Sequence, residues 1–408
     1  MKLLEKKHIP SEIENKWYDY WLDKKYFSSQ ESDNHYTIVI PPPNVTGKLH
    51  MGHVLNNTIQ DILIRKARME GKNACWIPGT DHASIATESK VTKMLLEKGI
   101  NKKDLSRDEF LEHAWQWKEK YGGTIINQLQ KLGCSCDWDK TNFTMDSHYS
   151  KAVLESFVRL YNKGLIYKGS KLVNWCPKSQ TALSDEEVMF KEVNGKLWHI
   201  KYAINDSDSF IEIATTRPET MLGDTAIAVN PKDNRYKKII GKTASLPLVG
   251  RNIPIIADSM VDPEFGTGCV KITPAHDLND YEVGIRHNLE VINIMNSDGS
   301  ISNKAPDKYV GMSREDARKE IVNNLKDLGF LTKEEDYLHK VGFSERGNVP
   351  IEYYLSEQWF LKMKNLAKPA SKAVKDKEIN FYPNHWVKTY NHWMDNIQDW
   401  CISRQIWW

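Results

Sequence analysis

The chain has 408 residues, more than one hydrophobic core usually accommodates, so we expect two or three domains. Hydrophobic residues make up 40%, charged residues 27%, and the formal net charge is +2. This balance excludes a uniformly basic nucleic-acid binder but allows a local basic surface. No membrane-length apolar stretch and no signal-peptide core are present, so we expect a cytoplasmic protein whose six cysteines are reduced.

The first organised segment is predicted to be a strand, a loop, a helix and a second strand. A β-branched strand over 36–40 ends at the proline-rich loop 41–47, because prolines cannot continue a central ladder. A helix over 50–69 is predicted to bury one face, and Gly71 is expected to cap it. The face comprises Met51, Val54, Leu55, Ile59, Ile62, Leu63 and Ala67. With a strand over 73–77, these elements predict a βαβ unit of a parallel sheet.

Helical patterns continue from residue 90 to about 164, and the sequence changes character near residue 195. Short β-rich runs follow, separated by Gly, Pro, Asn and Asp. These runs cover 210–216, 226–229 and 268–273. Helical character returns over 313–328, and a Trp-rich segment begins after about residue 347. Two α/β segments around a β-rich middle predict an inserted domain rather than consecutive domains.

The loop PPPNVTGKLHMGH (41–53) is predicted to leave the carboxyl end of a strand and enter a helix N-terminus, where phosphates bind. His50 and His53 share one face of the first helical turn, so both rings can donate hydrogen bonds to phosphate oxygens. Gly52 between them lets a flat ring approach the backbone. Neither GxxxxGK[ST] nor GxGxxG is present here. Taken alone, HxGH is a weak signal, because such histidine pairs are more often structural or solvated.

The segment HMGH resembles the HIGH motif of class I aminoacyl-tRNA synthetases, and PPPNVTG before it is similar to the valyl-tRNA synthetase version. Further segments resemble that family in order along nearly the whole chain: GTDHASIAT (79–87), DWDKTNFTMD (137–146), NWCPKSQTALSDEEV (174–188), ATTRPETMLGDTAIAV (214–229), GTGCVKITPAHDLNDYEVG (266–284), PIEYYLSEQWF (350–360) and DWCISRQIWW (399–408). The resemblance implies an α/β fold: a Rossmann-like catalytic domain of parallel sheet with an inserted β-rich editing domain. Its first half is expected over 1–190, the insertion over 191–345, and the return to the catalytic domain over 346–408.

The resemblance also implies ATP-dependent activation of valine and transfer of valine to tRNA-Val. ATP with Mg²⁺, valine and tRNA-Val are the expected partners; no membrane is expected, and the protein is expected to be a monomer. The implied ATP-binding residues are His50, Gly52 and His53, and the two histidines are the implied catalytic residues. The implied valine-binding residues are Pro42, Asn44 and Asp81. Asp81 would pair with the valine ammonium, although an Asp here can also be a helix N-cap.

A second, hydrolytic site is implied for the β-rich middle. Weak rejection of the near-isosteric threonine is an established property of valyl-tRNA synthetases, and editing corrects it. The implied editing residues are Arg217, Phe265, Lys271, Thr273, Asp277 and Asp280. Asp280 would bind the α-ammonium and stay ionised at neutral pH beside a helix N-terminus. Asp277 and Thr273 would meet the threonine hydroxyl, and the alternative for Asp277 is a helix cap.

No metal is expected where several valine-type enzymes carry a zinc knuckle, with one CxxC at each junction of the editing insertion. The first junction here reads CPKS, from Cys176 to Ser179, and the second reads SERG, from Ser344 to Gly347. One thiolate cannot hold structural zinc, and His339 is a poor substitute. We therefore expect no zinc, with the junction held by packing and backbone hydrogen bonds.

Two alternatives stay open. An isoleucyl- or leucyl-type synthetase would share the fold, although PPPNVTG and ATTRPETMLGDTA favour the valine type. The other alternative is a tRNA-binding or editing module without ligase activity. It arises because the KMSKS segment and the anticodon-binding helices of the family do not occur in these residues. We accordingly expect this chain to be a fragment that lacks complete activation activity.

Overall fold

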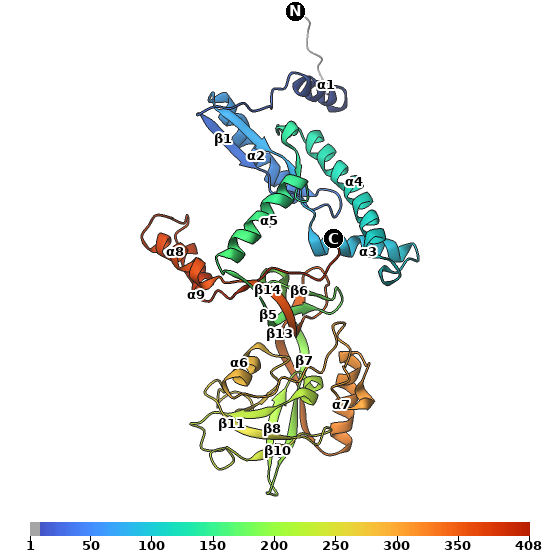
Figure 1. Cartoon of the computed structure of the whole chain (residues 1–408), viewed down its shortest axis with the longest axis vertical. Coiled ribbons are helices and arrows are strands. Elements are labelled where there is room, and N and C mark those ends of the chain that lie inside the picture. The colour runs from blue at the N-terminus through green and yellow to red at the C-terminus, as the bar shows by residue number, and fades with distance from the viewer. Residues whose placement is uncertain (1–8) are drawn as a thin grey trace, which may run out of the picture. The chain divides into compact units, whose positions relative to one another are not determined.

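The computed structural model describes residues 9–408, which form two compact units (Figure 1). The first unit comprises the described residues up to Leu160 together with Ile406–Trp408, and the second unit comprises Tyr161–Gln405. Among the described residues, none of the helices has the length and apolar character to cross a membrane. All six cysteines are free, as predicted.

The first unit is built from helices and short pairs of parallel strands. Its elements are α1 (Pro10–Asp23), β1 (His35–Val39), α2 (Met51–Met69), β2 (Asn73–Ile77), β3 (Gly79–Thr80), α3 (Ser84–Glu97), α4 (Arg107–Lys131), β4 (Asn142–Phe143) and α5 (Ser147–Asn162), the last of which ends just beyond the boundary. β1 pairs with β2 in parallel through α2, which confirms the predicted βαβ unit. β3 pairs with β4, also in parallel. The C-cap of α2 is Glu70, and Gly71 follows it in a left-handed conformation.

The predicted buried face of α2 is wrong for most of its residues. The side chains of Met51, Leu55 and Ile59 are 77%, 66% and 52% exposed, and Ile62 and Leu63 are exposed as well. The buried positions of this helix are Asn57, Ile64 and Ala67. The spacing of apolar residues shows which face of a helix is apolar, but it does not show which element packs on that face. Among the described residues, none of the elements covers the apolar face of α2.

Glu88 anchors the last residues of the chain in the first unit. Its carboxylate is buried on α3 and accepts hydrogen bonds from the backbone N–H groups of Trp407 (2.7 Å) and Trp408 (2.9 Å). Lys102 Nζ lies 2.5 Å from the same carboxylate and neutralises it. The Trp408 ring is buried in the core of this unit and donates through Nε1 to the carbonyl of His82. This contact places Trp408 beside the segment that follows β3, 326 residues earlier in the sequence.

The second unit contains a seven-stranded sheet and a four-stranded sheet. Its elements are β5 (Ile166–Cys176), β6 (Thr181–Leu183), β7 (Val188–Ile204), β8 (Phe210–Thr215), β9 (Ala226–Val229), β10 (Thr243–Ser245), β11 (Asn252–Ala257), β12 (Cys269–Ile272), α6 (Leu278–Arg286), α7 (Arg314–Asp327), β13 (Leu331–Ser344), β14 (Glu352–Leu361), α8 (Lys364–Lys375), α9 (Trp386–Asp395) and β15 (Trp400–Cys401). The larger sheet has the order β12-β9-β11-β10-β7-β13, with β8 also on β7, and the smaller has the order β15-β14-β5-β6. The three predicted β-rich runs are confirmed as β8, β9 and β12, and the predicted helix over 313–328 as α7.

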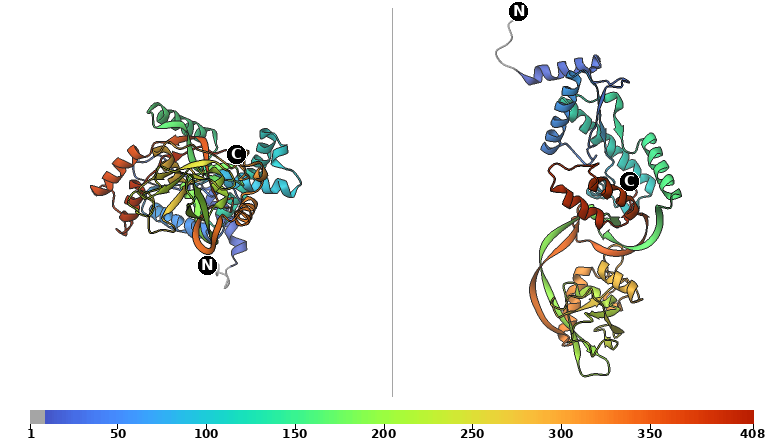
Figure 2. Two further views of the ribbon diagram at one scale, coloured as in Figure 1. Left: turned by 90° about the horizontal axis from the view of Figure 1, so that it is seen from below. Right: turned by 90° about the vertical axis from the view of Figure 1, so that its left-hand side faces the viewer.

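A long antiparallel ribbon connects the two sheets. β7 and β13 pair from Ile200 with Leu331 to Val188 with Ser344, and Figure 2 shows the two strands curving side by side. Beyond this ribbon the chain enters β14, which pairs along its whole length with β5. The aliphatic core of the larger sheet includes Ile200, Ile213 and Ile255, against which α7 packs with Ile321 and Leu325. The end of the ribbon at Val188 and Ser344 therefore joins the larger sheet to the smaller one.

Candidate functional sites

The two histidines of HMGH cap the start of α2. His50 is the N-cap, and its Nδ1 accepts a hydrogen bond from the Gly52 N–H (3.1 Å). His53 Nδ1 accepts from the His50 N–H (3.2 Å), and the two rings lie 4.1 Å apart. A neutral ring whose Nδ1 accepts carries its proton on Nε2. Capping therefore leaves both Nε2–H groups available as donors at a helix N-terminus, the arrangement that favours an anionic ligand.

The surroundings of the pair favour a neutral His53. Partial burial and the neighbouring His50 lower the pKa of His53. A Cβ at Gly52 would lie 2.9 Å from His50 Cε1, so a larger residue there would displace the His50 ring. The ring that approaches this glycine is thus that of His50. The approach of a nucleotide to Gly52 stays a prediction.

The residues predicted to bind valine come from two segments that lie side by side. Asn44 and Asp81 form an isolated parallel bridge, and the Val45 N–H donates to the Asp81 carbonyl (3.0 Å). Asp81 is not the N-cap of α3, since that position is Ala83. Its Oδ1 instead accepts from the Ala83 N–H (3.0 Å) and from the Thr144 hydroxyl (3.2 Å). Asp81 thereby stabilises the turn before the helix, and Pro42 lies exposed on the loop opposite.

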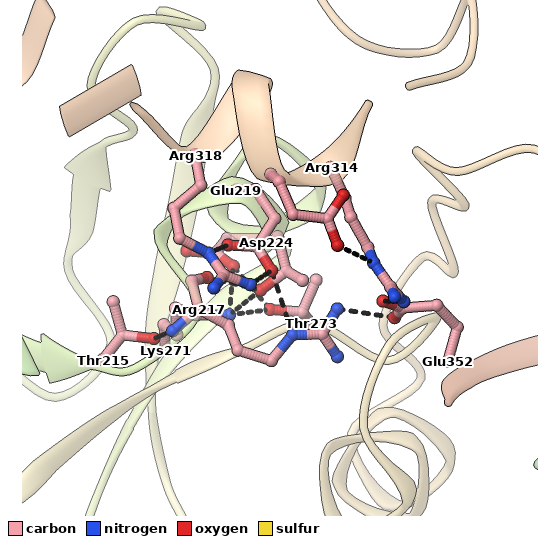
Figure 3. Close-up of polar contacts among 11 residues, drawn as sticks. Thr215, Arg217, Glu219, Asp224, Lys271, Thr273, Arg314, Arg318 and Glu352 are labelled. Atoms are coloured by element: carbon pink, nitrogen blue, oxygen red, sulfur yellow. Dashed lines mark hydrogen bonds and ion pairs between the residues drawn. The ribbon is translucent and has the colours of Figure 1, made fainter. Parts of the chain in front are cut away.

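In the second unit, Lys271 and Thr273 converge in a buried polar cluster (Figure 3). Lys271 lies on β12, and Thr273 is the first residue after this strand. Lys271 Nζ donates to the Thr273 hydroxyl (2.5 Å) and to the Thr220 hydroxyl (2.8 Å), and lies 3.3 Å from Asp224 Oδ1. Both residues are among the predicted editing residues. The structure adds Thr220, from the segment between β8 and β9, and Asp224.

Asp224 is the residue that sequence reasoning missed and that the cluster surrounds. Its side chain is completely buried. Its Oδ1 accepts from the Thr273 hydroxyl (2.6 Å), and its Oδ2 accepts from the Tyr202 hydroxyl (2.8 Å). Burial raises the pKa of Asp224, while Lys271 and the hydroxyl donors act against that shift. The one signal in the sequence is an aspartate two residues before the fully apolar strand β9.

Asp280 lies beside this cluster, in the first turn of α6. Its side chain is 6% exposed, and its Oδ2 accepts from the Thr273 N–H (2.8 Å). Burial and the neighbouring Asp277 raise the pKa of Asp280 to about 7. The expectation that Asp280 is firmly ionised at neutral pH is therefore wrong. The helix N-terminus favours the charge, but removal from water outweighs it.

Asp277 and Phe265 lie at the edge of the site. Asp277 is the N-cap of α6, with Oδ1 accepting from the Asn279 N–H (2.8 Å) and the Asp280 N–H (3.2 Å). The alternative of a helix cap is thus confirmed for Asp277, while its contact with a substrate hydroxyl stays a prediction. The Phe265 ring is 62% exposed, so it is open to a ligand that stacks on it.

Arg217 is held between two buried glutamates. Its Nη2 donates to Glu352 (2.5 Å) at the start of β14, and its Nε donates to Glu219 (3.1 Å). Arg318 also donates to Glu219, and Arg314 also donates to Glu352. Burial alone would raise the pKa of Glu219, but Arg318 and Arg217 lower it to about 2. These five charged side chains form an ion-pair ladder, in which arginines and glutamates alternate. Figure 3 shows the ladder next to Thr273 and Asp224.

The four junction positions, of which Cys176 alone supplies a thiol, lie together. A Cβ on Gly347 would lie 2.7 Å from Cys176 Sγ and 3.0 Å from Ser344 Oγ. The Ser179 N–H points to Cys176 Sγ (3.4 Å), and the Gly347 N–H donates to Ser344 Oγ (3.1 Å). One thiol and two hydroxyls do not make a zinc site. Backbone hydrogen bonds occupy these positions, and the part of the chain that the structure describes holds no group of three or more metal-ligating residues.

Comparison with known proteins gives the family. The family described as "tRNA synthetases class I (I, L, M and V)" matches residues 16–408. The chain therefore belongs to the class I tRNA synthetases.

Within that family, the chain is similar to proteins named "Valine--tRNA ligase". That of Bacteroides fragilis is 60% identical over 406 residues, and that of Clostridium tetani is 56% identical over 405 residues. Each alignment covers 99% of this chain but 46% of the relative, so the chain spans about half the length of the curated relatives it matches. Among solved structures, a LeuRS chain from Agrobacterium radiobacter K84 in a ternary complex matches with a TM-score of 0.40 and 18% identity over 85% of this chain and 49% of that chain.

We predict that the purified protein contains no stoichiometric zinc, because Ser179, Ser344 and Gly347 supply no thiolate beside Cys176. Elemental analysis should give well below one zinc per chain. A variant with all three positions changed to cysteine is the matched control and should gain one zinc, since the four positions already lie together. One zinc per wild-type chain, retained after mild chelation, would contradict the prediction.

Proposed function

We propose that the chain forms the N-terminal part of a valine–tRNA ligase with hydrolytic editing. The identity to valine–tRNA ligases along almost the whole chain supports the ligase assignment and disfavours an isoleucyl or leucyl type. The buried cluster of Lys271, Thr273 and Asp280 carries the editing assignment, because a strand and a helix bring these polar groups together in a site largely closed to water. This activity would serve translation, and we propose that the protein acts in the cytoplasm, where tRNA and ATP are present.

The proposed organisation has a catalytic domain interrupted by an editing domain. Residues 1–190 form the first half of the catalytic domain, residues 191–345 the editing domain, and residues 346–408 the return to the catalytic region. The seven-stranded sheet with its long β7–β13 ribbon supports an inserted domain, because the ribbon brings the entering and leaving chain to the same place. Both catalytic segments belong to one polypeptide. Its proposed ligands are valine, ATP and tRNA-Val, and its proposed oligomeric state is a monomer.

In the proposed synthetic site, the valine carboxylate attacks the α-phosphorus of ATP and pyrophosphate leaves. His50 and His53 would donate from Nε2 to phosphate oxygens, and Gly52 would let the nucleotide lie close to the backbone. Asp81 would pair with the valine ammonium beside Asn44 and Pro42, on the bridged segments. Mg²⁺ would arrive bound to the phosphates of ATP, and no protein ligand is assigned to it.

In the proposed editing site, water attacks the ester carbonyl of threonyl-tRNA, and the ester bond breaks to give threonine and a free ribose hydroxyl. Asp280 would hold the α-ammonium of the ester through a charge-assisted hydrogen bond. Lys271, Thr273 and Asp277 would surround the threonine side chain. Phe265 would stack on the terminal base, and Arg217 would shape the wall next to Thr273.

For the synthetic site we predict that His53→Ala, in the full-length protein, slows valyl-adenylate formation about 100- to 1,000-fold. A donor that acts on charge developing in the transition state affects the rate more than it affects valine binding. The measurement is pre-steady-state adenylate formation together with the valine dissociation constant. An unchanged rate would show that His53 serves only as part of the helix cap.

For the editing site we predict a bell-shaped pH profile of kcat/KM for deacylation of threonyl-tRNA. The raised pKa of Asp280, about 7, means that the carboxyl is protonated below neutral pH and cannot pair with an ammonium. Activity should therefore rise about tenfold per pH unit up to about pH 7. It should fall again above about pH 8, where the substrate α-ammonium loses its proton. Spontaneous ester hydrolysis is subtracted at each pH.

The variant Asp280→Asn is the control for that profile. It keeps the shape of the side chain and removes the charge, so deacylation should become slow and lose the limb below pH 7. Valine activation by the full-length variant should remain near normal. Deacylation as fast as in the wild type would refute the ammonium role, and lost valine activation would move Asp280 to the synthetic site or to the fold.

A further inference from the structure

A pocket of about 440 Å³ lies between α3 and α4 of the first unit (Figure 1). Neither of the candidate sites includes it. Its charged lining consists of Lys90, Lys93, Lys98, Lys120 and Glu97. Four lysines less one glutamate give this lining a formal charge of +3. A concave surface with one prevailing sign of charge attracts ligands of the opposite sign.

The lysines of the pocket have little use within the fold. Among residues 9–408, none pairs a carboxylate with Lys90, Lys98 or Lys120. Lys93 lies 3.9 Å from Glu97 and stays 76% exposed. Four ammonium groups that share one glutamate repel one another, and a bound anion relieves this repulsion. The pocket is therefore suited to a ligand with several negative charges.

The row of lysines on α3 is longer than one phosphate group. Lys90 and Lys98 are eight residues apart, which is about 12 Å along a helix, and Lys93 lies between them. A nucleic-acid strand carries a phosphate roughly every 3 Å of its helix axis, so several phosphates fit along this length. Lys120 lines the same pocket from α4. The lining therefore matches a polynucleotide backbone better than a single phosphate.

The pocket adjoins the loop that leads to the proposed synthetic site. Trp117 lines the pocket, and its Nε1 donates to the Val45 carbonyl (2.7 Å) in the loop 41–47. α4 also holds the residues after this loop through Gln128, whose Oε1 accepts from the Leu49 N–H (2.9 Å). A large substrate that reaches the loop would also meet the pocket.

We propose that this pocket binds the phosphate backbone of the acceptor arm of tRNA. The proposal rests on the proposed ligase function, in which the terminal ribose at the end of that arm receives valine. Lys90, Lys93 and Lys98 contact successive phosphates, and Lys120 approaches the same strand from α4. Such contacts position a nucleic acid without reading its sequence. The pocket supplies affinity and orientation for the arm.

The first test measures binding of an acceptor-arm minihelix of tRNA-Val to the 408-residue chain by fluorescence anisotropy at several salt concentrations. The variant Lys90→Gln/Lys98→Gln removes two charges from an exposed helix surface and keeps helix-forming residues there. Its Kd should rise about 10- to 100-fold at low salt. The slope of log K against log salt should become shallower by about 2, which is about 1 for each lysine.

The matched control is Lys16→Gln/Lys24→Gln, which removes two exposed lysines of α1 that do not line the pocket. Its Kd should stay within about threefold of the wild-type value, with the salt slope unchanged. Equal losses in the two variants would show a general attraction between charges and would contradict the proposal.

A second measurement uses the wild-type chain alone. The acetylation rate of each lysine is followed by mass spectrometry with and without the minihelix. Lys90, Lys93, Lys98 and Lys120 should be protected, and Lys16 should not. An anticodon-arm minihelix of equal length should protect the pocket much less. Equal protection by millimolar pyrophosphate alone would assign the pocket to a small phosphate ligand, and that result or an absence of protection would overturn the proposal.

The full-length protein separates this inference from the proposed function. Failure of the wild type to charge tRNA-Val would overturn the proposed ligase function, whereas protection of the pocket by the minihelix would still support a nucleic-acid site. Charging of tRNA-Val by Lys90→Gln/Lys98→Gln with an unchanged KM for tRNA would overturn the inference alone. The proposal requires that KM to rise about 10-fold or more.

Discussion

Two buried glutamates shared among three arginines hold the polar site of the second unit in place. Glu219 pairs with Arg318 and Arg217, and Glu352 pairs with Arg217 and Arg314. Arg217 therefore links the segment after β8, on the larger sheet, to β14 on the smaller one. Removing one partner from such a buried network typically costs about 3–5 kcal/mol, because the remaining charges stay out of water without compensation. Thr220 connects this network to the Lys271 cluster, because its hydroxyl donates to the Arg217 carbonyl (3.0 Å) and accepts from Lys271 (2.8 Å).

The properties of the Lys271 cluster follow from its burial away from water. Groups that are removed from water bind one another strongly, so Lys271, Thr273 and Asp224 adopt one set of directions. The same removal from water raises the pKa of Asp280 to about 7, so its charge depends on pH in the range where the enzyme would work. In the proposed editing role, an α-ammonium that entered the site would favour the carboxylate form of Asp280. Substrate binding and ionisation of Asp280 would then be coupled.

Much of the local structure could be predicted, because it depends on neighbours in sequence. Short β-rich runs predicted β8 and β9, and the His50–His53 spacing predicted two rings on one helical turn. The ladder could not be predicted, because Arg217 and Glu352 are 135 residues apart.

Local reasoning also misled in two places. The helix N-terminus near Asp280 suggested a stable charge, but tertiary burial outweighs it. The apolar spacing of α2 predicted a buried face, but most of that face is exposed. Asp224 could not be predicted, because its partners come from β7 and β12 rather than from adjacent positions.

The central proposal is that the buried cluster of Lys271, Thr273 and Asp280 belongs to an editing site for threonyl-tRNA. Calorimetry of the 408-residue chain with adenosine carrying threonine or valine through a non-hydrolysable 3′-amide tests it most directly: the account predicts at least about tenfold tighter binding of the threonyl compound, and equal or tighter binding of the valyl compound would contradict it.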